Sequence, residues 1–193
     1  MNKNIYILIV LIATLAAPTL AASQDSGRGV LFQLGAGASF PSYPSQVETV
    51  LSYMDSVPGI DRLKLSLDIA LGAAISQQTY VMARVDGMAD RLYDSHDFIQ
   101  MNLYLYSLGL RYYPSVTGFY IEGGAGASRE VLQSSVAGDL ASDFAFGFGA
   151  AIGYDFNRNA RGFGLCVEAK YDNLTIENEQ VGALMLTLNL CWK

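Results

Sequence analysis

Eight charged residues recur at alternate positions of otherwise apolar segments, a spacing that could supply ion pairs or paired carboxylates for acid–base chemistry. They are Asp68, Arg84, Asp86, Arg111, Glu122, Glu168, Lys170 and Asp172. Alternate residues of a β-strand point to one face, and that face is otherwise rich in Gly, Ala and Ser. Buried charges are tolerated only when they are paired. We therefore expect these side chains to form ion pairs inside the molecule.

Short turns between neighbouring strands would bring specific charges together. One turn places Arg111 almost opposite Glu122, and another places Arg84 diagonal to Asp68, within reach of a long side chain. A third turn would set Glu168 and Lys170 against glycines at positions 149 and 147, which leave space for them. The main interpretation is an interior filled by ion pairs, and the alternatives are a gated polar path and carboxylate catalysis.

The two cysteines, Cys166 and Cys191, fall on the same face as the charges. An exported protein with an even cysteine count can form a disulfide. The expected strand pairing sets these two about two positions out of register, where most pairs lie too far apart to bond. We expect two small buried residues, with a disulfide as the alternative. The only histidine, His96, lies beside Asp94 and Asp97 in a loop, so we expect no metal site.

Two glycine pairs, Gly35 with Gly37 and Gly124 with Gly126, could suggest nucleotide binding. Neither completes the spacing of a dinucleotide fingerprint, and no helix pattern follows either pair. We read them as strand positions that face a narrow interior, and we expect no cofactor.

The charges must be positioned by β-strands, because apolar residues recur with a period of two. Five regular segments and three less regular ones give eight strands: 32–40, 65–75, 144–154, 163–171 and 184–192, then 79–90, 98–113 and 119–130. A face of Gly, Ala, Ser and a few charges would solvate an exterior poorly but fits a narrow lumen. We expect the large Leu, Phe and Ile side chains to face lipid, as in outer-membrane strands.

Composition supports a membrane barrel. Apolar residues make up 51% of the 193-residue chain and charged residues 16%, where about 25% charged is usual. Long connections (41–62, 90–97 and 131–142) alternate with short ones (76–79, 114–118 and 156–161), followed by a medium one at 173–180. Outer-membrane barrels gather their long loops outside the cell. The net charge of −6 argues against nucleic acid as a partner.

The first residues follow the three-part pattern of a secretory signal peptide. Lys3 precedes an uncharged apolar run at 5–17, and small residues occupy 21–23. The alternative, an anchor helix, needs about 20 apolar residues. We expect a cleaved signal peptide over 1–23 and one outer-membrane β-barrel domain over 24–193.

Three segments carry a resemblance to a known family: LGLRYYP at 108–114, the glycine-rich strand at 122–128, and the terminal alternating strand that ends in Trp192. The chain resembles the small eight-stranded outer-membrane proteins of the OmpA, OmpX and OmpW type. The resemblance implies an all-β, antiparallel, up-and-down transmembrane barrel without enzymatic activity, located in a bacterial outer membrane and inserted by the assembly machinery there. Lys193 departs from the family's usual aromatic end.

External loops are where such barrels place their function. In the first loop, Val47, Val50, Leu51 and Met54 recur at helical spacing and predict a short amphipathic helix over the barrel mouth, able to contact a ligand. We expect surface interaction with a host or matrix ligand, or passage of small, hydrophobic molecules, with outer-membrane lipid around the barrel. The alternative is a soluble periplasmic lipocalin-like binding barrel.

Overall fold

The computed structural model of the chain describes residues 29–136, 138–159 and 162–193. The expected signal peptide, residues 1–23, lies outside them, and its cleavage stays a prediction. Within the described residues, no helix combines the length and the apolar character needed to cross a bilayer.

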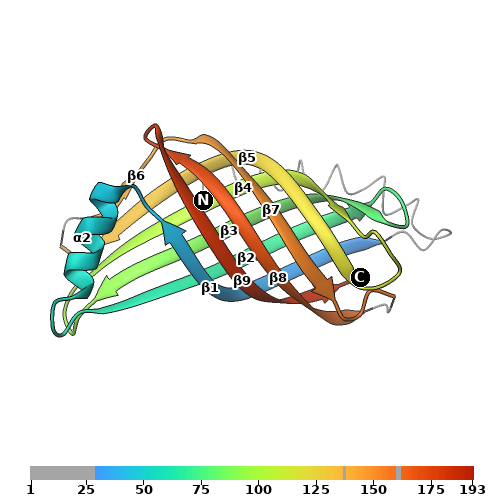
Figure 1. The fold of residues 1–193 in the computed structure, drawn as a ribbon, viewed down its shortest axis with the longest axis horizontal. Helices are drawn as coiled ribbons and strands as arrows, with labels where there is room; N and C mark the ends of the chain where they lie inside the picture. Colours follow the sequence, from blue (N-terminus) through green and yellow to red (C-terminus); the bar gives the residue numbers. More distant parts are fainter. Residues whose placement is uncertain (1–28, 137, 160–161) are drawn as a thin grey trace.

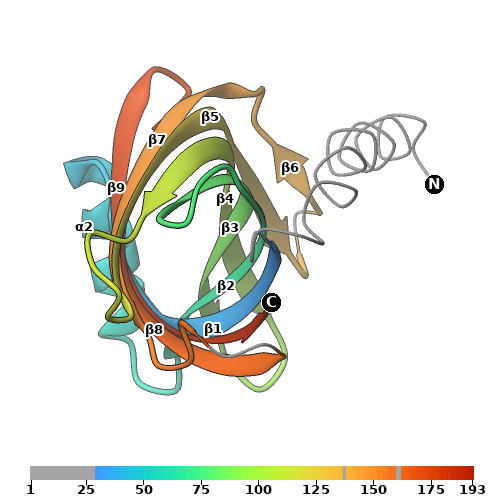
Figure 2. The same ribbon diagram turned by 90° about the vertical axis from the view of Figure 1, so that its right-hand side faces the viewer.

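The described residues form nine strands and one helix. They are β1 (Val30–Ser42), α2 (Ser45–Asp55), β2 (Asp61–Ala74), β3 (Thr79–Tyr93), β4 (Phe98–Tyr112), β5 (Phe119–Ser134), β6 (Leu140–Ala141), β7 (Ala145–Asp155), β8 (Phe163–Ile176) and β9 (Glu179–Trp192). Eight strands pair antiparallel in sequence order, and β1 pairs with both β2 and β9, which closes the sheet. β6 only extends the edge of β5. The predicted eight-stranded barrel is confirmed (Figure 1, Figure 2).

The two ends of the barrel differ. One end holds the C-terminus and the β2–β3, β4–β5 and β7–β8 turns, and the other holds α2 with the β3–β4, β5–β7 and β8–β9 connections (Figure 1). In outer-membrane barrels the termini lie on the periplasmic side. We therefore call these the periplasmic end and the external end.

All four external connections are shorter than predicted, and two of them are at most half the predicted length. β3 runs on to Tyr93, which leaves four loop residues, and β8 continues to Ile176 instead of ending at position 172. Glu177 and Asn178 then turn the chain with φ angles of 48° and 71°, the left-handed pair of a two-residue hairpin. The medium connection expected at 173–180 is wrong because Leu174 and Ile176 are apolar residues that face inward.

The orientation of the two faces follows the prediction. Leu67 on β2 and Leu108 on β4 are 64% and 65% exposed on the outer surface, while the lumen-facing Arg111 and Glu168 are buried. A soluble lipocalin-like barrel would place its large apolar residues along the axis and its charges outside. That alternative is wrong for this chain.

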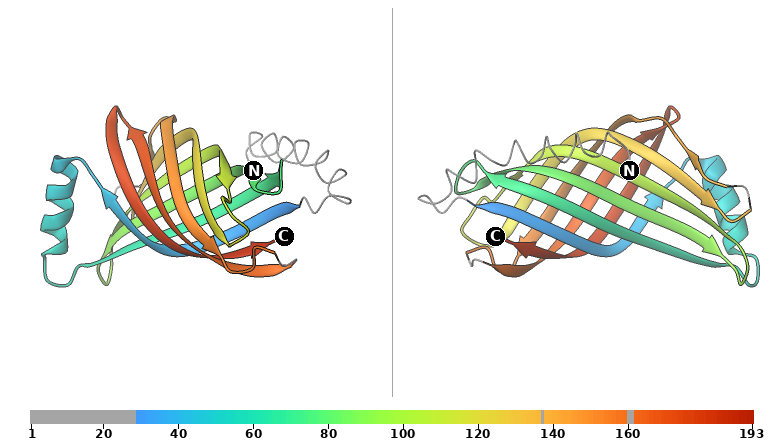
Figure 3. Two further views of the ribbon diagram at one scale, coloured as in Figure 1. Left: turned by 45° about the vertical axis from the view of Figure 1, so that its right-hand side comes forward. Right: turned by 180° about the vertical axis from the view of Figure 1, so that it is seen from behind.

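The helix α2 lies across the external mouth (Figure 3). Leu51 is buried, and Val47 and Met54 pack with it against an apolar cluster in the lumen that includes Leu103 and Met185. Val50 was expected on the same face, but it is 58% exposed on the outer side of the helix. The predicted amphipathic helix is confirmed, with three of its four marked residues packed inward.

The outward orientation predicts a large penalty for a charge in mid-strand. Leu67→Arg places a cation in the hydrocarbon layer and should lower the free energy of unfolding by about 2–4 kcal/mol. The measurement is guanidinium unfolding in phospholipid vesicles, followed by tryptophan fluorescence. Val116→Arg, in an exposed periplasmic turn, is the control and should change little. Equal stability of the Leu67→Arg variant and the parent would contradict the lipid-facing assignment.

Candidate functional site: the filled lumen and the external mouth

Arg84, on β3, is the centre of the lumen's charged layer. Its guanidinium nitrogens lie 2.8 Å from Glu122 Oε1 and 2.6 Å from Glu168 Oε1, with Asp68 at 3.5 Å. All four side chains are almost completely buried. The diagonal contact expected between Arg84 and Asp68 is present, and the same arginine also links β3 across the lumen to β5 and β8.

Arg111 forms the second centre of this layer. Arg111 and Glu122 are direct partners in the β4–β5 register, and Arg111 Nε donates to Glu122 Oε2 at 2.6 Å. The same guanidinium donates to Gln33 at 2.9 Å and lies over the Tyr120 ring, 4.0 Å from its centroid. The expected pairing of Arg111 with Glu122 is therefore confirmed.

Lys170 completes the network from β8. Its ammonium group contacts Asp86 directly and lies 3.7 Å from Asp68 and 3.6 Å from Glu168. The structure thus brings together seven of the eight charges expected to pair in the lumen. Asp172 is also fully buried on this face, but its carboxylate forms no ion pair or hydrogen bond with the described residues, so the expectation is wrong for this residue.

Small residues leave room for these long side chains, but not where we expected. Glu168 faces Gly153 and Lys170 faces Ala151, four positions away from glycines 149 and 147. The expectation is wrong because the β7–β8 turn is centred further toward β8, with Asp155 and Cys166 as the last partners. A Cβ on Gly153 would lie 2.2 Å from the Tyr120 ring. Glycine at this position therefore admits the tyrosine that donates to Glu168 at 2.8 Å.

Little space remains in the lumen. A cavity of about 10 Å³ lies among Arg84, Asp86, Glu122, Lys170 and Asp172, which is room for about one water molecule. An apolar cluster containing Leu105, Leu174 and Met185 fills the external side of this layer. The interior is packed in layers and offers no wide polar path through the described residues.

The periplasmic side of the lumen is closed by tyrosines. Tyr113 packs edge-on against Tyr80, with ring centroids 5.9 Å apart, and at a tilt against Tyr120, with centroids 5.4 Å apart. Arg158, from the β7–β8 turn, lies 3.8 Å above the Tyr113 ring. Lys193, the residue after the terminal strand, forms an ion pair with Asp155. Burial lowers the pKa of the Lys193 ammonium from its usual value.

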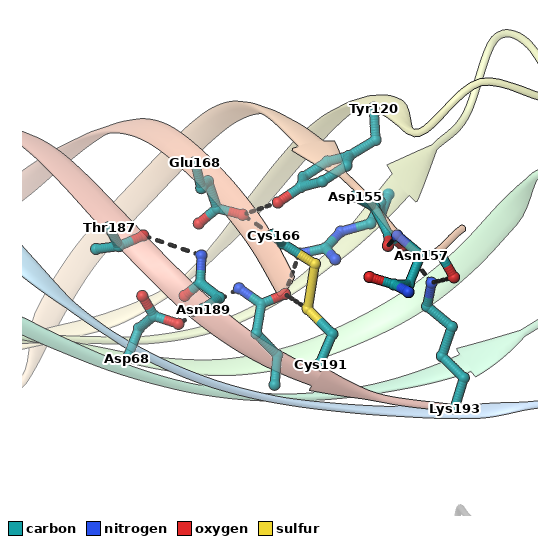
Figure 4. Close-up of a disulfide and its surroundings, with 12 residues drawn as sticks. Asp68, Tyr120, Asp155, Asn157, Cys166, Glu168, Thr187, Asn189, Cys191 and Lys193 are labelled. Carbon is teal, nitrogen blue, oxygen red and sulfur yellow. Dashed lines mark hydrogen bonds and ion pairs between the residues drawn. A yellow bond between two sulfur atoms is a disulfide. The ribbon is translucent and has the colours of Figure 1, made fainter. Parts of the chain in front are cut away.

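Cys166 and Cys191 form a disulfide beside this layer (Figure 4). Their predicted offset is confirmed, because Cys191 is the register partner of Gly164 and not of Cys166. The expectation of two unbonded cysteines is wrong. Their Cα atoms are only 6.6 Å apart, within the range that a disulfide can bridge. Inward side chains converge in a narrow barrel, which brings a diagonal pair closer than it would be in a flat sheet.

Arg62, near the start of β2, joins α2 to the barrel wall at the external mouth. Its guanidinium donates to both oxygens of Asp90 on β3, at 2.9 and 2.7 Å. It also lies 4.0 Å from Glu48 and from Asp55, near the two ends of α2. The buried Tyr43 hydroxyl is close to this group, and burial, then the nearby Asp90 charge, raises its pKa. One arginine therefore links the helix to the barrel wall.

A cleft of about 260 Å³ opens beside α2. Its lining combines apolar and aromatic residues with three carboxylates. They are Tyr43, Pro44, Val47, Met101, Leu103, Ile176 and Val181, with Glu130, Glu177 and Glu179. The sequence did not reveal this cleft, because its walls come from the β1–α2 link, α2, four strands (β4, β5, β8 and β9) and the β8–β9 turn.

The external connections share one electrostatic character, which the sequence does show once the connections are located. They contain no Lys or Arg. Their acidic residues are Glu48, Asp55, Asp94, Asp97, Asp139, Asp143 and Glu177. The mouth of the barrel is therefore acidic.

The short loop around His96 is ordered by Asp94. The Asp94 carboxylate accepts hydrogen bonds from the backbone N–H groups of His96 at 2.7 Å and Asp97 at 2.8 Å. These bonds lower the pKa of Asp94. In the described part of the chain, no group of three or more His, Cys, Asp or Glu side chains has an arrangement that could hold a metal ion.

A family model for the outer membrane protein beta-barrel domain matches residues 7–193. The chain belongs to this family. The comparison with curated proteins gives no match.

Two solved structures share the fold of this family member at low sequence identity. Ail, the attachment invasion locus protein of Yersinia pestis, was solved in complex with the heparin analogue sucrose octasulfate and is 12% identical, with a TM-score of 0.60. The match covers 86% of this chain and 99% of Ail. Neisserial surface protein A is 16% identical with a TM-score of 0.61, over 85% of this chain and 96% of the other. At such identities the likeness shows the fold alone.

Coupling between Arg111 and Glu122 can be measured by a double-mutant cycle. Arg111→Met alone leaves buried carboxylates short of a partner and should lower the free energy of unfolding by about 3–5 kcal/mol. Combined with Glu122→Met, the loss should fall short of the summed single losses by about 1–3 kcal/mol. Arg111→Met combined with the distant Asp139→Asn is the control and should be additive. Additivity in both cycles would contradict the ion pair.

The disulfide can be tested by intact mass spectrometry. Denatured protein should take up no iodoacetamide before reduction and two adducts afterwards. Cysteines 25 residues apart close a loop whose cross-link contributes roughly 3–4 kcal/mol of stability, and the Cys166→Ser/Cys191→Ser variant should lose about that amount. Two adducts without reduction would show that the bond is absent.

Proposed function

We propose that this protein is a non-enzymatic outer-membrane barrel that binds a cationic partner at its external mouth and passes no solute through its lumen. The observation that carries the proposal is the combination of a filled interior with an acidic cleft at the exposed end. The family supports a membrane location, and the cleft supports a role at the cell surface.

The packed lumen weighs against the passage of small molecules. A solute entering from outside would first have to displace α2 and the apolar cluster beneath it. It would then have to separate Arg84 and Arg111 from their carboxylates, which lie as close as 2.6 Å. Breaking such buried pairs leaves uncompensated charge and is strongly unfavourable.

The acidic mouth favours a partner that carries positive charge. Its connections lack Lys and Arg, and Glu130, Glu177 and Glu179 line the cleft. A polysulfated sugar of the kind bound in the Ail complex would meet only repulsion from these carboxylates. A peptide that carries both basic and apolar side chains fits this mixed lining, since Lys and Arg bury their apolar stems and keep the charge at the surface.

Export and insertion complete the proposal. We infer that residues 1–23 are removed on export and that the assembly machinery of the outer membrane inserts the barrel through its terminal strand, which ends at Trp192. The intact mass measured in the disulfide test also identifies the first residue of the mature chain.

Binding can be tested with the purified barrel in zwitterionic nanodiscs, with a lysine- and leucine-containing peptide and heparin as probes. We expect the peptide to bind, the affinity to fall as salt rises, and heparin not to bind. Glu177→Gln/Glu179→Gln should weaken peptide binding about tenfold, or about 1.4 kcal/mol.

Asp139→Asn/Asp143→Asn removes the same charge outside the cleft and should change the affinity less than threefold. Equal losses of affinity in the two variants would mean that the peptide responds to the overall negative charge of the mouth, and would contradict binding in the cleft. In planar bilayers we expect no stepwise conductance. Stepwise currents from the folded barrel would instead favour passage through the lumen.

A further inference from the structure

The outer surface of the barrel carries almost no charge. Outward-facing positions of the eight barrel strands hold three charged residues among those the structure describes: Asp61, Arg91 and Arg129. The two arginines lie on β3 and β5, on either side of β4. At the same level, the outward residues of β8, β9 and β1 are uncharged.

Polar amides fill the surface between these arginines. Gln100 is the register partner of both Arg91 and Gln133, and Arg129 faces Tyr104. Gln100 donates to Asn102 at 2.6 Å, and Asn102 donates to Gln133 at 3.0 Å. We call Arg91, Gln100, Asn102, Arg129 and Gln133 the headgroup face.

Neither arginine has a carboxylate within ion-pair distance among the described residues. The Arg91 guanidinium lies over the Phe98 ring at 4.4 Å, and its Nε is buried without a hydrogen-bond partner. Arg129 Nε donates only to the Ser142 carbonyl at 3.0 Å, with its guanidinium 5.1 Å from the Phe144 ring. Aromatic side chains thus position both cations, and neither cation is held in an ion pair with the described residues. Asp61, the one outward carboxylate, is diagonal to Arg91 in the β2–β3 register but outside ion-pair distance.

The height of the face matches the edge of the bilayer. Arg91 and Arg129 lie twelve and ten residues above the periplasmic starts of their strands, at Thr79 and Phe119. A tilted strand with a rise of about 3.3 Å per residue places them roughly 25–30 Å up. The outward apolar band of such barrels is about 25 Å tall. Lipid phosphates lie just beyond this band. Tyr104 is level with Arg129 in the β4–β5 register, and Tyr106 lies two residues closer to the periplasmic end.

From these observations we infer that the headgroup face binds an outer-leaflet lipid whose headgroup carries two phosphates, one at Arg91 and one at Arg129. The arginines are two strands and four residues apart in register, which separates their Cα atoms by roughly 16 Å. One phosphate group cannot readily meet both side chains over that span. The amides of the face can donate to sugar or phosphate oxygens between them. This inference does not depend on the proposed cleft.

The test uses the full mature barrel in phosphatidylcholine nanodiscs that contain a few per cent of a bisphosphorylated lipid A. Native mass spectrometry should find one tightly retained lipid A per barrel. Arg91→Gln/Arg129→Gln should reduce the retained fraction at least tenfold, and each single variant should retain an intermediate amount. Arg158→Gln at the periplasmic end also removes one positive charge and should leave retention unchanged. Heat-dependent gel mobility verifies that each variant is folded.

Two further probes identify the ligand. Lipid A with a single phosphate should be retained less than the bisphosphorylated form, and millimolar inorganic phosphate should not displace the lipid. Equal retention by the double variant and the parent would overturn the inference. Equal retention of phosphatidylglycerol would show that the headgroup face attracts any anionic lipid, and would contradict a site for two phosphates. Displacement of the lipid by inorganic phosphate would show that the face is an anion site and not a lipid site.

Discussion

Inside a bilayer no water is available to backbone N–H and C=O groups, so every one of them must find a partner within the protein. The pairing of β1 with β9, from Phe32 and Trp192 to Ser42 and Gly182, meets this requirement by joining the two ends of the sheet. Closing eight strands leaves an interior that side chains just fill. The glycines at positions 35, 149 and 153, the long polar chains opposite them and the outward leucines all follow from that narrow closed ring.

The interior is layered, and each layer limits what the barrel can do. Tyrosines and a disulfide fill the periplasmic side, ion pairs fill the middle, and an apolar cluster under α2 fills the external side. Since the ion pairs run between strands far apart in sequence, such as Arg84 with Glu168, they hold opposite walls together. A barrel held together in this way is a rigid support for its external end. The chemistry that can meet a partner is therefore on the mouth and on the outer surface.

Charge is distributed by height along the barrel. The external connections are acidic, the headgroup face is basic, and the outer surface between that face and the periplasmic end is apolar. These zones correspond to three surroundings: bulk water, lipid phosphates and hydrocarbon. The same chain can thus attract a cationic partner from solution and an anionic headgroup from the membrane, because the two surfaces lie at different levels.

Much of this architecture could be predicted from the sequence. Period-two alternation is a local property, so it located eight strands, their outward apolar face and the inward charges, and the spacing of Val47, Leu51 and Met54 located the helix. Register across short turns also placed Arg111 opposite Glu122. The pattern failed at Leu174 and Ile176, because the alternation is inverted there: the inward residues are apolar, and the outward ones, Asn173 and Thr175, are polar.

Tertiary structure alone decided the remainder. The curvature of the closed barrel brought Cys166 and Cys191 within bonding range, and the length of the β7–β8 turn set which glycine faces Glu168. The external cleft and the headgroup face are each assembled from segments distant in sequence. Alternation specifies which side of a strand a residue occupies, but only ring closure fixes which residues meet across the lumen or lie side by side at one height.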